Sequence, residues 1–144
     1  MDSPHTAIDS NLISAYLKTE YHIEWVPPLR LSIGVEHPAL AELFAAFHAH
    51  SAAYVTACNP HSQRIDDAEN TERLARLETE LKSRGLSLVA GRAIDPHGNW
   101  PDETGLLVMG LSLESAKSLG RHYQQNALVW CGSTLVPELI LLEE

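Results

Sequence analysis

The sequence predicts an α+β fold: a mixed or antiparallel sheet with a ferredoxin-like βαββαβ centre, preceded by an N-terminal helix–strand extension. Residues 51–131 read in order as strand, helix, strand, strand, helix and strand, which is the split βαβ order. A right-handed crossover makes the first two strands parallel, with the third between them and the fourth beside the first. With 144 residues, 44% hydrophobic and 20% charged, we expect one globular domain over residues 1–144.

The N-terminal extension is predicted from the spacing of apolar residues. Leu12, Ile13 and Tyr16 recur at intervals of three and four, as on one face of a helix. The next run alternates apolar and polar residues until Pro27 and Pro28 interrupt it, because proline cannot donate to a strand ladder. We therefore expect disorder at residues 1–8, a helix over about 10–19, and strands at 21–25 and 29–34 that form an exposed edge hairpin or one bulged strand.

The central unit shows helix starts and stops. Asp66 and Asp67 favour a helix N-terminus, Gly85 is a typical C-terminal cap, and Ser112 is a typical N-cap. The predicted elements are a helix from Pro38 to about 48, a strand at 52–58, a helix from 66 or 67 to 85, a strand at 86–91, a polar loop at 92–102, a strand at 104–111, a helix at 112–123, a strand at 126–131 and an extended segment at 139–142. We expect the helices mostly on one face of the sheet.

This topology brings polar residues from distant parts of the chain to one edge of the sheet. Asn70 lies four residues before Leu74 on the buried stripe of its helix, so its amide needs hydrogen-bond partners, and the Asn59 turn is the nearest. Arg73 is expected to reach Glu103 or Asp95. The residues expected at this edge are Asn59, Ser62, Asn70, Arg73, Asp95, Trp100, Glu103, Arg121, Gln125 and Asn126.

Two interpretations of this polar edge remain open. In the first it binds a ligand, which Asn59, Asn70 and Gln125 orient. Arg73 holds an anionic group bidentately, and Glu103 is the candidate catalytic acid or base. In the second, the same residues satisfy one another and hold the 92–102 loop in place. Trp100 is expected to cover the core and anchor this loop, or to offer an exposed stacking platform.

The amino-acid composition limits the kinds of partner and the cellular location that we expect. The net charge of −9 argues against duplex nucleic acid, which demands a basic face, and fits either a basic protein partner or solubility alone. No run approaches the ~20 apolar residues that cross a bilayer, and the polar N-terminus is unlike a secretory signal, so we expect no membrane association. Cys58 and Cys131 lie in separate predicted strands, which favours a reduced cytoplasmic protein with Cys58 as a packing thiol.

No cofactor or metal site is predicted. Asp95 and Glu103 lack the D-x-D type spacing that indicates a cation site. The eight histidines show no H-x-x-x-H pattern, so His61 and His97 are expected to be solvated surface residues. The chain contains no nucleophile elbow, P-loop or G-x-G-x-x-G, so its motifs leave any catalysis undecided.

A set of short motifs between residues 16 and 131 carries a family resemblance. The motifs are Tyr16-x-x-Thr19-x-Tyr21, Val55-Thr56-Ala57-x-Asn59-Pro60-x-Ser62, Asn70 with Arg73, Gly85, Asp95-Pro96, Trp100-Pro101-x-Glu103, Val108-x-Gly110, Gly120-Arg121 and Gln125-Asn126-Ala127. In these motifs the chain resembles a bacterial family known as domain of unknown function 3293. Two positions depart from the family pattern: Gln124 stands where glycine is common, and Cys58 where a bulky residue is frequent. The resemblance implies a bacterial cytoplasmic protein and implies no activity.

These observations lead to three hypotheses of function. The first is a cytoplasmic binding or regulatory domain whose polar pocket takes a small anionic or nucleotide-like ligand. The second is a hydrolase or transferase that acts on a phosphorylated or carboxylated small molecule through Glu103 and Arg73. The third is an acidic protein-interaction module of the immunity type, in which the net charge steers a basic partner.

Overall fold

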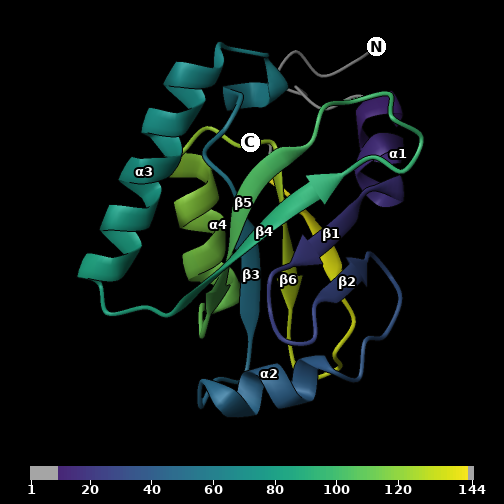
Figure 1. The fold of residues 1–144 in the computed structure, drawn as a ribbon, viewed down its shortest axis with the longest axis vertical. Coiled ribbons are helices and arrows are strands. Elements are labelled where there is room, and N and C mark those ends of the chain that lie inside the picture. Colours follow the sequence, from purple (N-terminus) through teal and green to yellow (C-terminus); the bar gives the residue numbers. More distant parts are fainter. Residues whose placement is uncertain (1–9, 143–144) are drawn as a thin grey trace.

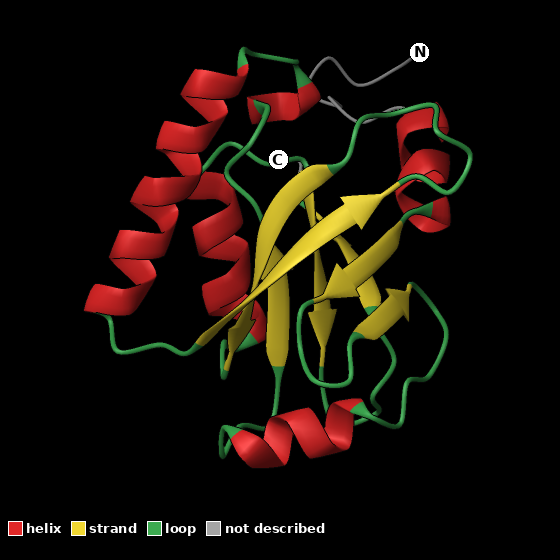
Figure 2. Cartoon of the chain, viewed as in Figure 1, coloured by secondary structure: helices red, strands yellow, loops and turns green. Residues whose placement is uncertain are grey.

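The structure is a computed structural model that describes residues 10–142, so the disorder predicted for residues 1–8 lies outside the described residues. Helices flank a strongly curled antiparallel sheet (Figures 1 and 2). The helices are α1 (Ser10–Lys18), α2 (Leu40–Ala46), α3 (Asp67–Ser83) and α4 (Leu113–His122). The strands are β1 (Glu20–Ile23), β2 (Leu29–Ser32), β3 (Ala52–Val55), β4 (Leu88–Ile94), β5 (Glu103–Met109), β6 (Ala127–Cys131) and β7 (Glu138–Leu141). The predicted α+β class is confirmed.

The seven strands lie in the order β2-β1-β4-β5-β3-β6-β7, and each neighbouring pair is antiparallel. Of the two predicted alternatives, the sheet is therefore antiparallel and not mixed. As the sequence predicts, β5 lies between β3 and β4, and β6 lies beside β3. The hairpin of β1 and β2 is added at the outer edge of β4, with His22 opposite Arg92.

Apolar side chains pack on both faces of the sheet. On one face, Leu77 of α3 and Leu119 of α4 join a cluster with Val108. On the other, Leu43 of α2 joins the inward side of the β1–β2 hairpin, so the prediction of helices mostly on one face holds for α3 and α4 alone. None of the helices within residues 10–142 combines the length and apolar character that a bilayer span requires.

The β1–β2 hairpin forms one edge of the sheet, which is the first of the two alternatives predicted for residues 21–34. Strand β1 is paired on both sides, with β2 and with β4, so β2 is the edge strand. Just after β2, the Gly34 N–H donates to the Pro137 carbonyl and the His37 N–H to the Leu135 carbonyl, both at 2.9 Å. These two bonds join the segment after β2 to the segment before β7.

Chain turns fix where the polar residues lie. The Asp66 carboxylate accepts the Glu69 N–H at 2.7 Å and caps α3, and Ser112 caps α4 through the Ser115 N–H at 3.1 Å. Strand β4 continues to Ile94, so the polar loop is shorter than predicted and occupies residues 95–102. The end of β3, the start of α3 and the start of β5 then meet at one end of the sheet (Figure 1).

Candidate functional site

The turn after β3 is held in an unusual backbone conformation. Asn59, His61 and Ser62 have positive φ angles of 48°, 54° and 60°. Non-glycine residues adopt this left-handed region rarely, although asparagine tolerates it better than most. Surrounding contacts must therefore hold the turn, and the side chain of Asn59 supplies several of them.

Asn59 and Asn70 form a reciprocal pair that joins the turn to α3. The Asn59 backbone N–H donates to Asn70 Oδ1 at 2.8 Å, and Asn70 Nδ2 donates to Asn59 Oδ1 at 2.9 Å. Asn59 Oδ1 also accepts the Ile65 N–H at 3.2 Å. The prediction that Asn70 finds its partner at the Asn59 turn is confirmed. With its oxygen occupied, the Asn59 amide has one orientation, in which Nδ2 points at Glu103.

Glu103 is a shielded carboxyl group without a counter-charge. Asn59 Nδ2 donates to Glu103 Oε2 at 2.8 Å, and no described Lys, Arg or His lies within 4.0 Å of the carboxylate. Oε1 accepts no hydrogen bond from the described residues. Burial raises the pKa of Glu103 above its ordinary value, and the hydrogen bond from Asn59 offsets part of this shift. Such a group in a hollow is typical of functional sites.

Three tyrosines lie near enough to Glu103 to feel its charge. The Tyr54 hydroxyl donates to the Glu103 carbonyl at 3.2 Å, and its ring meets Tyr21 edge-on at 5.1 Å. Tyr54 needs Gly105 beneath it, since a Cβ there would lie 2.5 Å from the ring. Burial raises the pKa of Tyr16, Tyr21 and Tyr54, and the Glu103 carboxylate adds to each shift, so all three remain hydroxyl donors at neutral pH.

Sequence reasoning missed these tyrosines as neighbours of the site, and it had a usable signal. Glycine inside a strand often marks the close approach of another group, and Gly105 lies in β5. The predicted edge residues Ser62 and Asn126 connect to the tyrosines: Asn126 Nδ2 donates to Ser62 Oγ at 2.9 Å, and the Tyr16 hydroxyl lies 3.0 Å from the same oxygen. This chain of contacts attaches α1 to the Asn59 turn.

Arg73 serves the backbone and not Glu103. Its Nε donates to the Ala57 carbonyl at 2.6 Å, and Nη2 donates to the Tyr123 carbonyl at 2.7 Å and to Gln124 Oε1 at 3.1 Å. The expectation that Arg73 reaches Glu103 or Asp95 is therefore wrong, because its donors bind backbone carbonyls just after β3 and just after α4. Gln124 has a φ of 58°, which explains why glycine suits this position.

Gln125 also binds backbone carbonyls in the segments after β3 and α4. Its Nε2 donates to the Cys58 carbonyl at 3.1 Å and to the Tyr123 carbonyl at 3.2 Å. Arg121 is exposed, as are His61 and His97, the two predicted surface histidines. Gln125 and Arg73 thus hold the end of β3 against the end of α4, and within residues 10–142 neither side chain hydrogen-bonds to the 92–102 loop that the second interpretation expects them to hold.

Asp95 and Trp100 lie apart from the Asn59 turn. The Asp95 carboxylate accepts the His97 and Asn99 N–H groups at 2.9 and 2.8 Å, so it caps its own loop. The backbone hydrogen bond from His97 is the largest cause that lowers the Asp95 pKa. Trp100 is 56% exposed, so the expectation that it covers the core is wrong.

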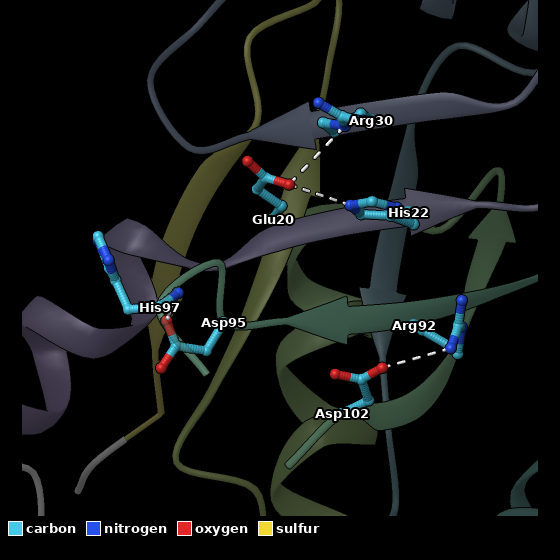
Figure 3. Close-up of polar contacts among 7 residues, drawn as sticks. All are labelled: Glu20, His22, Arg30, Arg92, Asp95, His97 and Asp102. Carbon is cyan, nitrogen blue, oxygen red and sulfur yellow. Dashed lines mark hydrogen bonds and ion pairs between the residues drawn. The ribbon is translucent and has the colours of Figure 1, made fainter. Parts of the chain in front are cut away.

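Ion pairs lie on the outer side of strands β2, β1, β4 and β5 (Figure 3). Glu20 lies 3.7 Å from Arg30 and 3.1 Å from His22, and Arg92 lies 3.3 Å from Asp102. The last pair joins β4 to the end of the 95–102 loop. Asp102 is therefore partly neutralised by Arg92, in contrast to Glu103 next to it.

A hollow of about 240 Å³ opens beside Glu103, between the start of α3 and the start of β5. Asn59, Asn70 and Glu103 contribute to its lining, together with Asp67 and Asp102. A larger hollow of about 450 Å³ lies between α3 and α4, but its Glu80 carboxylate already accepts the Tyr123 hydroxyl at 2.7 Å. We therefore regard the smaller hollow, called the Glu103 pocket below, as the candidate site.

The comparison with known families bears on this site directly. The pattern of a family described as proteins of unknown function, DUF3293, matches residues 55–128, just over half of the 144 residues. The chain belongs to the DUF3293 family. No curated protein and no solved structure matches the chain. The part that matches DUF3293 contains every residue that lines the Glu103 pocket, whereas Tyr16, Tyr21 and Tyr54 precede it.

The described part of this DUF3293 chain has few groups suited to binding a metal ion or to nucleophilic thiol chemistry. Over residues 10–142, no three His, Cys, Asp or Glu side chains lie close enough together to form a metal site. Cys58 lines the Glu103 pocket, and burial is the main cause that raises the pKa of its thiol. Burial likewise raises the pKa of Cys131 to about 12. Both thiols stay protonated at neutral pH and are poor nucleophiles.

Proposed function

We propose that the chain is a small-molecule binding domain whose site is the Glu103 pocket. The observation that carries this proposal is the shielded Glu103 carboxylate, which receives one hydrogen bond from Asn59 and has no cation within 4.0 Å among residues 10–142. Burying a carboxylate without a counter-charge is costly, so folds usually pair it. A site that keeps one oxygen of such a group free supplies an acceptor for a ligand.

Size and chemistry limit the ligand. The pocket volume of about 240 Å³ is below the roughly 300–1,000 Å³ typical of sites for drug-sized molecules, which favours a small molecule or the head group of a larger one. The anionic or nucleotide-like ligand suggested by the sequence depended on Arg73, whose donors contact Ala57, Tyr123 and Gln124. A polar ligand that donates hydrogen bonds fits the lining better.

Catalysis is the second candidate function, favoured by the raised pKa of Glu103. A carboxyl group with this property can hold or release a proton nearer neutral pH than an ordinary glutamate, as a general acid or base requires. In such an enzyme Arg73 would be a positioning residue, since it holds the β3 end that carries Asn59. The interaction-module hypothesis draws support only from the net charge of −9.

Two broader assignments accompany the proposal. The strand order β4-β5-β3-β6 with helices α3 and α4 on one face supports a ferredoxin-like centre, extended by β1, β2 and β7. The free thiols of Cys58 and Cys131 support a reducing compartment, consistent with a cytoplasmic protein.

A thermal-shift screen tests the binding function. Wild type, Glu103→Gln and Glu114→Gln would be heated with amines, carboxylates, phosphorylated metabolites, nucleosides and divalent metal ions. A ligand at about one hundred times its Kd stabilises the folded state by about 2.7 kcal/mol, which is readily detected. Glu114 is the matched control because it is exposed and lies on α4. We expect a compound that shifts wild type and the Glu114→Gln variant but not Glu103→Gln, whereas equal shifts in all three proteins would contradict the proposal.

A further inference from the structure

Acidic residues outnumber basic residues in the lining of the Glu103 pocket. Its charged lining comprises Asp67, Asp102 and Glu103 against a single basic residue, Arg64. A carboxylate can only accept hydrogen bonds, and the amides of Asn59 and Asn70 already pair with each other. A ligand that contacts these carboxylates therefore has to supply donors.

Glu103 adds the requirement of positive charge. Asp102 has Arg92 at 3.3 Å, but no described cation lies within 4.0 Å of Glu103. Any donor makes a charge-assisted hydrogen bond to the ionised carboxylate, but a cationic donor adds a Coulomb attraction that is stronger at a shielded group than in bulk water, so a cation gains more here than a neutral donor. Because the described residues hold no three-ligand metal cluster, the cation that fits is organic.

We infer that the Glu103 pocket binds an alkylammonium or guanidinium group, whose N–H donors meet the free Oε1 of Glu103 while its charge neutralises the carboxylate. This inference depends on the proposed function and names its ligand class. The same group occurs in free amines and in the arginine and lysine side chains of a peptide.

Three four-carbon compounds isolate the effect of charge: putrescine is a dication, 1,4-butanediol is neutral and succinate is a dianion. Each would be titrated calorimetrically into wild type, Glu103→Gln and Glu114→Gln near neutral pH, with agmatine and a capped tripeptide with a central arginine as further probes. We expect putrescine or agmatine to bind wild type, with affinity at least tenfold lower for Glu103→Gln and unchanged for Glu114→Gln. Glu103→Gln keeps the shape and an acceptor for Asn59, so it should fold.

The other outcomes separate the two claims. Binding of 1,4-butanediol or succinate that is as tight as that of putrescine and is lost in Glu103→Gln would overturn the cation inference and leave the binding function standing. If no cationic probe binds up to about 10 mM, the inference fails whatever the wider screen finds. Tripeptide binding at least tenfold tighter than agmatine binding would assign the group to a peptide side chain, and the reverse order would assign it to a free amine.

Discussion

Replacing Asn70 with alanine tests whether the Asn59–Asn70 pair holds the turn that orients Glu103. The change removes the acceptor of the Asn59 N–H at 2.8 Å and the donor to Asn59 Oδ1 at 2.9 Å. Two hydrogen bonds contribute about 1 kcal/mol each, and a partly buried N–H without a partner costs about 1 kcal/mol more. The higher helix propensity of alanine relative to asparagine offsets roughly 0.6 kcal/mol of this loss. The free energy of unfolding should therefore fall by about 2–2.5 kcal/mol.

Urea denaturation measures this loss. With a slope of about 1–3 kcal/mol per molar urea, the midpoint should fall by roughly 1 M. Asn11→Ala is the matched control, because Asn11 is an exposed residue of α1, and its substitution should change the free energy of unfolding by about 0.5 kcal/mol or less. Equal midpoints for the two variants would refute the argument that the Asn59–Asn70 pair stabilises the turn.

Three further substitutions follow from the same contacts. Gly105→Ala should lower the free energy of unfolding by about 1–3 kcal/mol in thermal denaturation, because its Cβ would lie 2.5 Å from the Tyr54 ring. Arg73→Ala should lower it by about 2–3 kcal/mol in urea, since two backbone carbonyls lose their charged donor, whereas the exposed Arg76→Ala should cost about 0.5 kcal/mol or less. Glu103→Gln should gain stability relative to wild type as pH rises from about 4 towards 7, measured by urea unfolding across pH.

The sign of the last prediction comes from the raised pKa of Glu103. The folded chain retains the proton in a pH range where an unfolded glutamate, with a pKa of about 4.3, has lost it. Stability linked to this group is therefore fully present below that value and is lost as pH rises through the folded pKa. Glutamine cannot ionise and escapes this loss. A constant difference between the two proteins across pH would contradict the argument.

The predictions for Gly105→Ala and Arg73→Ala can each be contradicted by a definite result. Wild-type stability of Gly105→Ala would mean that Tyr54 does not lie over β5 as described. Equal losses from Arg73→Ala and Arg76→Ala would mean that the carbonyl contacts of Arg73 contribute nothing beyond a surface ion pair.

Local signals in the sequence were sufficient for the elements and for one contact of the site. Asp66 and Ser112 are caps because a side-chain oxygen can satisfy a free N–H at a helix start, which depends only on nearby residues. Asn70 could be assigned to Asn59 because its spacing from Leu74 and Leu77 places it on the inner face of α3. Such inferences need only helix geometry and the order of the strands.

Contacts that depend on the curl of the sheet could not be predicted in the same way. Tyr21 and Tyr54 meet because β1 curls over towards β3, although β4 and β5 lie between them in the sheet, and sequence periodicity carries no measure of that curvature. The donors of Arg73 are taken by the carbonyls of Ala57 and Tyr123, and every residue has a carbonyl, so the sequence does not indicate these partners. The sequence-based prediction paired Arg73 with Glu103 because their charges are opposite, and that prediction was wrong.

The most direct test of the account is an NMR titration of the Glu103 side-chain carboxyl carbon, assigned by its loss in Glu103→Gln. The account predicts a pKa above that of an ordinary glutamate in the free protein, and a lower pKa when putrescine or agmatine is bound, because a neighbouring cation favours the charged form. An ordinary pKa that does not change with either amine would contradict both the shielded carboxylate and the cation site built on it.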